Sequence, residues 1–152
     1  MDPLPTSHKW LLNTEDYSAC LSLRFEVFRD EQKFDSDLEI DEYDSKDNVE
    51  TKNLLIFNSL TSEPMATARL IKKESGKWYM GRVCVKKIYR GLGLGKLLIE
   101  LTERKAKEME VQELRVSSQL YIRSLYEKME FKAVGEVYLD ENVEHITLVK
   151  RI

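Results

Sequence analysis

The stretch that most constrains the fold of this chain runs from residue 81 to residue 98. Its first half carries the β-branched residues Val83 and Val85 on either side of Cys84, which predicts a strand. Glycines then occupy alternate positions, at Gly91, Gly93 and Gly95. Leucines at helical spacing overlap and follow them: Leu94, Leu97, Leu98 and Leu101. The stretch therefore predicts a strand, a glycine-rich turn and a helix start, in that order.

A glycine turn at a helix start is a typical phosphate site. Backbone N–H groups approach a ligand closely where no Cβ intervenes, and the first N–H groups of a helix lack partners and carry partial positive charge. Arg90 and Lys96 flank the turn and add formal charge. Such a turn can bind phosphate or pyrophosphate, although the glycines could equally serve the geometry of a tight turn alone.

Two familiar phosphate loops do not fit this turn. A P-loop lysine is followed by a serine or threonine that supplies a hydroxyl to Mg²⁺, whereas Leu97 follows Lys96. The dinucleotide-binding turn needs the spacing Gly-x-Gly-x-x-Gly, whereas the spacing here is Gly-x-Gly-x-Gly. The sequence thus argues against a nucleotide kinase and against a dinucleotide-binding turn.

Length and charge limit the classes of function. The 152 residues suit a single domain over residues 1–152, and 42% hydrophobic with 34% charged residues can build a core. The net charge of -3 argues against a nucleic-acid partner. No apolar run approaches the roughly 18 residues of a membrane helix, so no membrane partner is expected. Cys20 and Cys84 fall in predicted core elements, so we expect free buried thiols in a reducing cytoplasm.

The hydrophobic pattern predicts helices and strands in a mixed order. A helix is expected from Thr14 to Asp30, capped by Asn13 or Thr14, after a short strand at 9–12. An antiparallel meander, a helix, a strand parallel to the meander's last strand, another helix and two final strands should follow: 53–59, 65–73, 78–86, 93–109, 113–118, 121–129, 131–138 and 145–150. The acid-rich segment from Asp35 to Asp44 is either a solvated loop or a pocket wall that attracts a cationic amine.

The spacing Arg90-x-x-Gly93-x-Gly95 resembles the pyrophosphate motif of the GCN-related N-acetyltransferases, the GNAT superfamily. The order of the predicted elements around that motif is similar to the family's. The resemblance implies an α+β GNAT fold: a mixed, mostly antiparallel central sheet flanked by helices, with the fourth and fifth strands splayed. It also implies acetyl-CoA as the cosubstrate and no metal.

Further residues strengthen the resemblance. Leu125-Tyr126 is similar to the apolar residue and tyrosine of the family's last helix, although Glu130 precedes Phe131 where the family usually has glycine. Dispersed segments in the right order resemble the ElaA/YjcF branch of the superfamily: Arg24-x-x-Val27-Phe28-x-x-Glu31-Gln32, Ile40-Asp41, Ala68-Arg69, Gly81-Arg82-Val83, Gln119, Gly135-Glu136-Val137-Tyr138 and His145-Ile146.

The resemblance implies a course for the cofactor along the chain. The main chain of Val83, Cys84 and Val85 would pair with the pantetheine arm. The turn would hold the pyrophosphate through Arg90, Gly91, Leu92, Gly93, Leu94, Gly95 and Lys96. Tyr126 would lie near the sulfur and return a proton to the leaving thiolate, because a phenol of pKa about 10 is within reach of a thiol of about 8.5. Without the motif, Tyr126 reads as a core aromatic on a helix face.

The general base and the acceptor site are less specified. We expect Glu31 as the base because it lies in a branch-matching segment, with Asp41 and His145 as alternatives. Arg82, Gln119 and His145 are expected to bind the acceptor. Each also has a structural reading: a strand ion pair for Arg82, a helix cap for Gln119, and a structural histidine at a strand start for His145.

The sequence therefore predicts an N-acetyltransferase that moves an acetyl group from acetyl-CoA to a primary amine by direct attack in a ternary complex. The acceptor is a small molecule or a protein amine, and a homodimer through the last strands is an open alternative to a monomer. The competing hypothesis is a non-catalytic acyl-CoA-binding module that senses or scaffolds. Such a module would keep the glycine turn but would need no proton-transfer groups.

Overall fold

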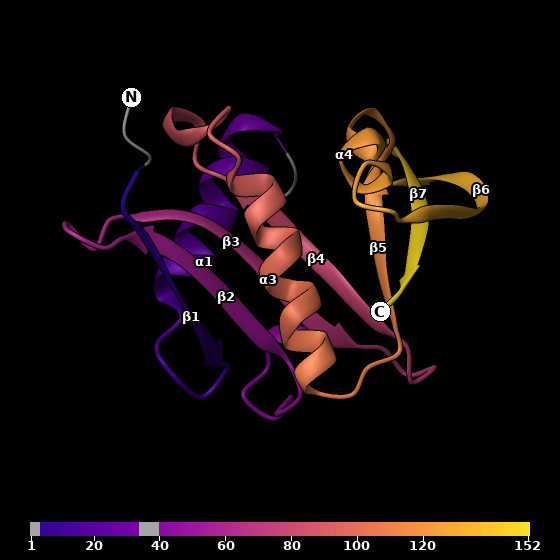
Figure 1. Ribbon diagram of the computed structural model, residues 1–152, viewed down its shortest axis with the longest axis horizontal. Helices are drawn as coiled ribbons and strands as arrows, with labels where there is room; N and C mark the ends of the chain where they lie inside the picture. Colours follow the sequence, from indigo (N-terminus) through magenta and orange to yellow (C-terminus); the bar gives the residue numbers. More distant parts are fainter. Residues whose placement is uncertain (1–3, 34–39) are drawn as a thin grey trace.

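The computed structural model describes residues 4–33 and 40–152. Its centre is a seven-stranded sheet in the order β1-β2-β3-β4-β5-β7-β6, with helices on both faces (Figure 1). The elements in chain order are β1 (Thr6–Leu12), α1 (Ser18–Arg24), η1 (Phe25–Glu31), η2 (Glu42–Asp44), β2 (Lys52–Asn58), β3 (Pro64–Lys72), β4 (Trp78–Val85), η3 (Lys87–Tyr89), α3 (Leu94–Glu108), β5 (Glu113–Gln119), η4 (Leu120–Ile122), α4 (Arg123–Glu127), β6 (Lys132–Asp140) and β7 (Val143–Arg151).

The sheet confirms the predicted topology. Strands β2, β3 and β4 pair antiparallel through short hairpin connections, and β1 pairs antiparallel to β2 although residues 13–51, which include α1, separate the two strands. Strand β5 pairs parallel to β4 because α3 carries the chain back across the sheet. This parallel pairing covers only three positions, from Trp78 opposite Leu114 to Met80 opposite Val116. Beyond Met80 the two strands diverge, which is the predicted splay (Figure 1).

A β-bulge in β4 lies where the splay begins. From Gly81 to Cys84 strand β4 advances three residues, whereas β3 advances only two between their partners Arg69 and Thr67. Arg82 has a φ of 49°, in the left-handed region that bulges can require. Without a bulge, side chains at even positions would all face one way. Here Met80 packs in the core beneath α3, whereas Cys84 packs beside α1.

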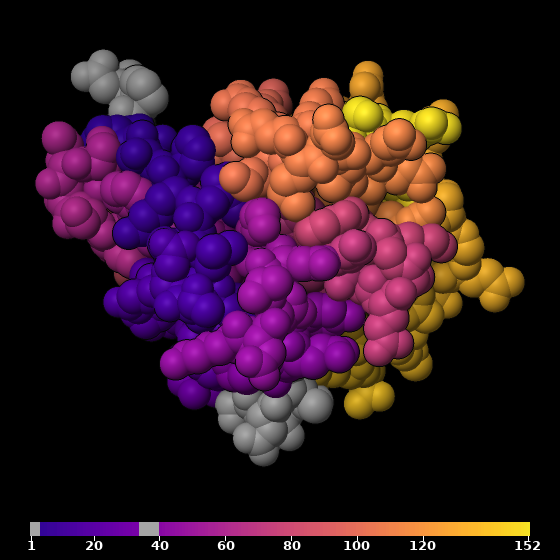
Figure 2. All heavy atoms as spheres, turned by 90° about the horizontal axis from the view of Figure 1, so that it is seen from below, coloured from indigo at the N-terminus to yellow at the C-terminus, as the bar shows by residue number. Residues whose placement is uncertain are grey.

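Two apolar layers hold the helices to the sheet. Helix α3 covers one face through a core that includes Leu98, Ile99 and Leu101, and α1 covers the other face. In the view from below, the end of α3 (orange) lies on one side of the molecule and the purple segment around η2 on the other (Figure 2). Cys20 and Cys84 are buried free thiols in the α1 layer, as predicted, and burial raises the pKa of Cys20.

The first helix begins later than the sequence predicts. It starts at Ser18, and the predicted cap at Asn13 or Thr14 is wrong. The Asn13 amide instead donates hydrogen bonds to the carbonyls of Tyr43 (2.7 Å) and Ser45 (2.9 Å), and its oxygen accepts one from Asn53 (2.9 Å). Asn13 is buried and joins the end of β1 to the loop after η2, so it cannot cap a helix.

The last helical segment is also shorter than predicted. The expected helix at 121–129 consists of the 3-10 turn η4 followed by the single-turn helix α4.

Among residues 4–33 and 40–152, no helix combines the length and apolarity needed to cross a bilayer. Strand β6 forms the end of the sheet and exposes Val134, Val137 and Leu139. The expected homodimer stays a prediction.

A buried ion-pair cluster joins α1, η2 and β3. The Asp44 carboxylate accepts hydrogen bonds from Arg24 at 2.7 and 3.0 Å and from Arg69 at 3.4 Å. The Asp44 carboxylate also accepts a hydrogen bond from the backbone N–H of Asp41, 3.0 Å away. Burial alone would raise the pKa of Asp44, but Arg24, the Asp41 N–H and Arg69 together lower this pKa to about 2. The cluster therefore holds a charged carboxylate inside the protein.

This cluster makes stability depend on pH in a defined window. The folded pKa of Asp44 lies below its unfolded value of 3.8, so the stabilisation is present above about pH 4 and is lost as the pH falls towards 2. We expect Asp44 to contribute about 2 kcal/mol to the change in unfolding free energy over that window. Urea unfolding of the wild type and of Asp44→Asn between pH 6 and 2 measures it.

The asparagine variant should be less stable at pH 7 by about 3 kcal/mol, because a buried guanidinium loses its carboxylate. Its stability should also fall less steeply below pH 4 than that of the wild type. Asp47 is exposed, so Asp47→Asn serves as the control and should keep the wild-type profile. A full wild-type acid dependence in Asp44→Asn would contradict this account.

Candidate active site

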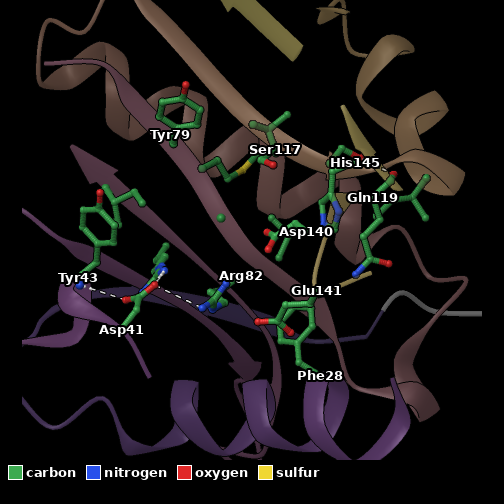
Figure 3. A pocket seen from close by; sticks show the side chains of 18 of the residues that line it. Phe28, Asp41, Tyr43, Tyr79, Arg82, Ser117, Gln119, Asp140, Glu141 and His145 are labelled. Carbon is green, nitrogen blue, oxygen red and sulfur yellow. Dashed lines mark hydrogen bonds and ion pairs between the residues drawn. The ribbon is translucent and has the colours of Figure 1, made fainter. Parts of the chain in front are cut away.

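A cavity of about 390 Å³ occupies the splay between β4 and β5. Its walls come from η1, the η2 region, β3, β4, β5, α4 and the β6–β7 turn (Figure 3). Five of the predicted site residues line it: Arg82, Val83, Gln119, Tyr126 and His145. The tertiary structure thus brings together side chains from the fourth strand, the fifth strand, the last helix and the last strand.

Arg82 is held on the β4 wall by an acid from the opposite layer. Its guanidinium lies 3.3 Å from the Asp41 carboxylate, which also accepts a 2.8 Å hydrogen bond from Arg69 (Figure 3). Asp41 in turn caps η2 by accepting from the backbone N–H of Tyr43 at 3.0 Å. Arg82 therefore forms the ion pair that the sequence offered as its structural role, and it also lines the cavity.

Residues 40–44 are the described part of the predicted acid-rich segment, since residues 34–39 lie outside the described residues, and Asp41 and Asp44 are two of its three described acids. Both carboxylates bind arginines of the protein itself. These contacts favour a structural role for the two acids over the attraction of a cationic amine. The alternative assignment of Asp41 as general base is disfavoured for the same reason.

Tyr126 is almost fully buried and still lines the cavity. It is 2% exposed, and its ring packs edge-on against Phe131 with the centroids 5.8 Å apart. Burial strongly raises the pKa of Tyr126 because the phenolate would be desolvated. Its hydroxyl makes no hydrogen bond to any residue in 4–33 or 40–152. The side chain is thus a neutral hydrogen-bond donor on the cavity wall.

His145 has a defined orientation on the opposite wall. Its Nδ1 lies 2.8 Å from the carbonyl oxygen of Val143, which can only accept a hydrogen bond. Nδ1 therefore carries the hydrogen, and Nε2 of the neutral ring is left as an acceptor. The ring stacks on Tyr138 with the centroids 5.9 Å apart, and the Tyr138 hydroxyl is hydrogen-bonded to Ser117.

Gln119 faces His145 across the β5–β7 pairing and lies beside it in the cavity (Figure 3). Its side-chain amide donates a 2.8 Å hydrogen bond to Gln32, at the end of η1. This bond ties the fifth strand to the first helical segment across the splay. Gln119 thus lines the site and does not cap the following turn, whose first N–H groups receive no side-chain cap among the described residues.

The glycine turn lies between β4 and the start of α3. Gly91 and Gly93 have φ values of 80° and 83°, which an L-residue with a Cβ rarely adopts. Helix α3 begins at Leu94 directly after Gly93, and no described side chain caps its first N–H groups. A 15-residue helix therefore presents its unpaired N-terminal N–H groups at the turn, as the sequence predicted.

Arg90 is fixed at the base of this turn. Its Nε donates to the Val85 carbonyl at 3.0 Å, and its guanidinium forms a 2.8 Å ion pair with Glu31 at the end of η1. Glu31 therefore contacts the glycine turn and is not among the residues that line the cavity. Lys96 lies on the exposed side of α3, 3.9 Å from Glu100.

Comparison with known proteins agrees with this geometry. A family model described as "Acetyltransferase (GNAT) domain" matches residues 25–152. The chain belongs to the GNAT family. The Escherichia coli protein ElaA is 25% identical and superposes with a TM-score of 0.84 over 96% of this chain and 99% of that one. An acyl-CoA N-acyltransferase from Pseudomonas aeruginosa is also 25% identical, with a TM-score of 0.83 over 95% and 99% of the two chains.

The relatives also support the predicted branch. The Bacillus subtilis protein described as an uncharacterized N-acetyltransferase, YjcF, is 24% identical over 139 residues, which are 91% of this chain and 94% of that one. This GNAT domain thus lies in the ElaA/YjcF-like branch, and the family supports acyl transfer from acyl-CoA. In the part of the chain that the structure describes, no three His, Cys, Asp or Glu side chains gather as metal ligands.

Sequence reasoning missed several cavity residues. Asp140 and Glu141 fall between the predicted strands at 131–138 and 145–150, and Lys73 and Tyr79 fall within the predicted strands at 65–73 and 78–86, yet all four line the cavity. Their spacing along the chain carries no signal, because strand pairing and the β6–β7 turn bring them together. The expected splay of the fourth and fifth strands indicates where a cavity forms but does not single out these four residues.

The turn glycines should differ in how they tolerate alanine. Gly93→Ala places a Cβ in the left-handed region and should lower the unfolding free energy by about 1–2 kcal/mol. Gly95 lies in the first turn of α3, where a Cβ would meet only the Leu125 side chain at 3.4 Å. Gly95→Ala should therefore keep or raise stability, by up to about 1 kcal/mol of helix propensity. Urea unfolding without ligand compares them, and equal losses would refute the conformational argument.

Proposed function

We propose that this protein transfers an acetyl group from acetyl-CoA to a primary amine by direct attack within a ternary complex. The observation that carries the proposal is the cavity in the β4–β5 splay, with the unpartnered Tyr126 hydroxyl on one wall and His145 on another. Membership of the GNAT family supports acyl-CoA as the donor. The acetyl group, the amine and a cytoplasmic location, which the free thiols support, are parts of the proposal.

The cofactor would bind along β4 and the glycine turn. The edge of β4 that faces β5 has no strand partner from Val83 to Val85, because the last β4–β5 pair is at Met80. The backbone groups along this edge could therefore hydrogen-bond to the amides of a pantetheine arm. The N-terminal N–H groups of α3 and the residues from Arg90 to Lys96 would hold the pyrophosphate. Charge repulsion between a pyrophosphate and Glu31 would then weaken the Glu31–Arg90 ion pair.

Two side chains would move the protons. The amine nitrogen attacks the thioester carbon, an N–H of the bulge stabilises the oxyanion, and the C–S bond breaks. His145 Nε2 would take the proton that the amine loses, and Tyr126 would donate its proton to the thiolate. The products are an amide and CoA thiol, and the tyrosine regains its proton from solvent or from His145.

This assignment differs from the expected role of Glu31. The Glu31 carboxylate lies against Arg90, whereas an attacking amine would lie in the cavity beside His145. We therefore favour Glu31 as a residue that positions Arg90 and the glycine turn. His145 is the better placed base because its hydrogen bond to Val143 directs the basic nitrogen away from the backbone.

Calorimetric titration with acetyl-CoA tests the cofactor site. The wild type should bind acetyl-CoA, and a Gly93→Glu, Gly95→Glu double variant should bind at least about 100-fold more weakly, because two carboxylates would oppose the pyrophosphate. A thermal melt establishes that the variant is folded. A folded wild type that does not bind acetyl-CoA would refute the proposed function.

Substitution of the proton-transfer groups separates an enzyme from a binding module. Tyr126→Phe and His145→Gln should each lower kcat by about 100-fold while acetyl-CoA binding stays within a few-fold of the wild type. The measurement is CoA release with a panel of amines, beside calorimetry of each variant. Folded variants that release CoA at the wild-type rate would exclude the assigned roles. A wild type that binds acetyl-CoA without transfer to any amine would favour a sensor or scaffold.

A further inference from the structure

Lys73 is a cation that the cavity leaves without an acidic partner. It follows β3 directly, is half-buried and lines the cavity. Its ammonium lies 4.1 Å from the centroid of the Tyr79 ring, so the aromatic face holds the charge in place. No carboxylate of residues 4–33 or 40–152 forms an ion pair with it. An ordered, half-buried ammonium without an anion is a natural contact for an anionic ligand group.

The other basic residues of the cavity differ from Lys73 in this respect. Arg69 forms ion pairs with Asp41 and Asp44, and Arg82 forms one with Asp41. Their guanidinium groups build the wall, and their carboxylate partners come from the protein. The positive charge at Lys73 is therefore the one that a ligand can neutralise without breaking an existing ion pair.

Another element of the cavity lining carries the complementary charge. Asp140, at the end of β6, lines the same cavity near His145, and its carboxylate has no ion-pair partner among the described residues (Figure 3). Lys73 and Asp140 do not pair with one another, so two opposite charges face one cavity from separate walls. An ammonium arriving at Asp140 would lie beside His145, where it could lose its proton.

We infer that the acceptor is an elongated zwitterion whose amine lies at His145 and whose carboxylate binds Lys73; this rests on the proposed function. Tyr79, which holds Lys73, pairs with Arg115, and His145 pairs with Gln119; strand β5 from Arg115 to Gln119 spans about 13 Å at roughly 3.3 Å per residue. Amine and carboxylate must therefore stand on the order of 10 Å apart, at the two ends of that path. An ω-amino acid with a long methylene chain, or a short peptide, meets this condition, whereas an α-amino acid is too short.

Bisubstrate conjugates test this inference without requiring the natural acceptor. In one conjugate the amine of 6-aminohexanoate is joined through an acetyl linker to the sulfur of CoA, and in its partner the carboxylate is replaced by a carboxamide. The wild type should bind the carboxylate conjugate at least about 10-fold more tightly than the carboxamide. A glycine conjugate, whose carboxylate cannot reach Lys73, should show no preference over its own carboxamide.

The adjacent lysine provides a matched control. Lys73→Met keeps the packing of an unbranched chain against Tyr79 but removes the charge, so it should abolish the preference for the carboxylate. Lys72 is exposed, lies 3.8 Å from Glu50 and points to the other side of β3. Lys72→Met should therefore retain the preference. Melting curves and acetyl-CoA titration establish that both variants fold and bind the cofactor.

The possible outcomes distinguish this inference from the proposed function. Equal affinity of the wild type for the carboxylate and carboxamide conjugates would overturn the zwitterion. The zwitterionic acceptor is also overturned if both 6-aminohexanoate conjugates fail to bind while acetyl-CoA binds. It is overturned as well if the glycine conjugate is preferred over its carboxamide as strongly as the 6-aminohexanoate conjugate is. A wild type that binds neither conjugate nor acetyl-CoA would refute the cofactor site itself.

Discussion

The site depends on the point at which β4 and β5 stop pairing. Their parallel hydrogen bonds end at Met80 and Val116, and the bulge at Arg82 then turns the fourth strand away. Both strands beyond that point expose backbone groups and side chains to one cavity. Backbone N–H and C=O groups that are shielded from water require partners. A splay is therefore stable where a ligand with its own amide groups, such as a pantetheine arm, can complete the pairing.

The rigidity of one wall comes from charges that the protein neutralises internally. Asp44 is held ionised among Arg24, Arg69 and the N–H of Asp41. Removing either the carboxylate or a guanidinium from such a cluster would leave a buried charge without compensation. This lowers the free energy of unfolding far more than the loss of an exposed ion pair does. The same cluster orients Arg82 through Asp41. Asp41 and Asp44, two acids of the segment for which either a solvated loop or an amine-attracting wall was expected, thus support the cavity wall.

In the proposed mechanism, the environment assigns opposite roles to Tyr126 and His145. Tyr126 lies in an apolar site that raises its pKa, so it stays a neutral donor. His145 donates Nδ1–H to a carbonyl, so in the neutral tautomer with this hydrogen bond its other nitrogen is the acceptor. Different surroundings would thus suit one side chain to act as the acid and the other as the base within the same cavity, which is how folded proteins divide such tasks. Because its pKa is raised, Tyr126 would transfer its proton fully only to a thiolate that is itself desolvated.

Local sequence determined the strand, glycine turn and helix around Gly93. The conformational freedom of glycine, the dipole of the helix start and the spacing of apolar residues all act within a few residues of the chain. It also determined the meander and the parallel fifth strand, since hairpins and crossover helices fix strand direction. Only the tertiary structure decided that Asn13 binds distant backbone carbonyls and does not cap the first helix. It also decided that Glu31 pairs with Arg90, and that Lys73 and Asp140 face one cavity. Those contacts join residues far apart in sequence, and strand register, the bulge and the packing of helical segments against the sheet decide which of them meet.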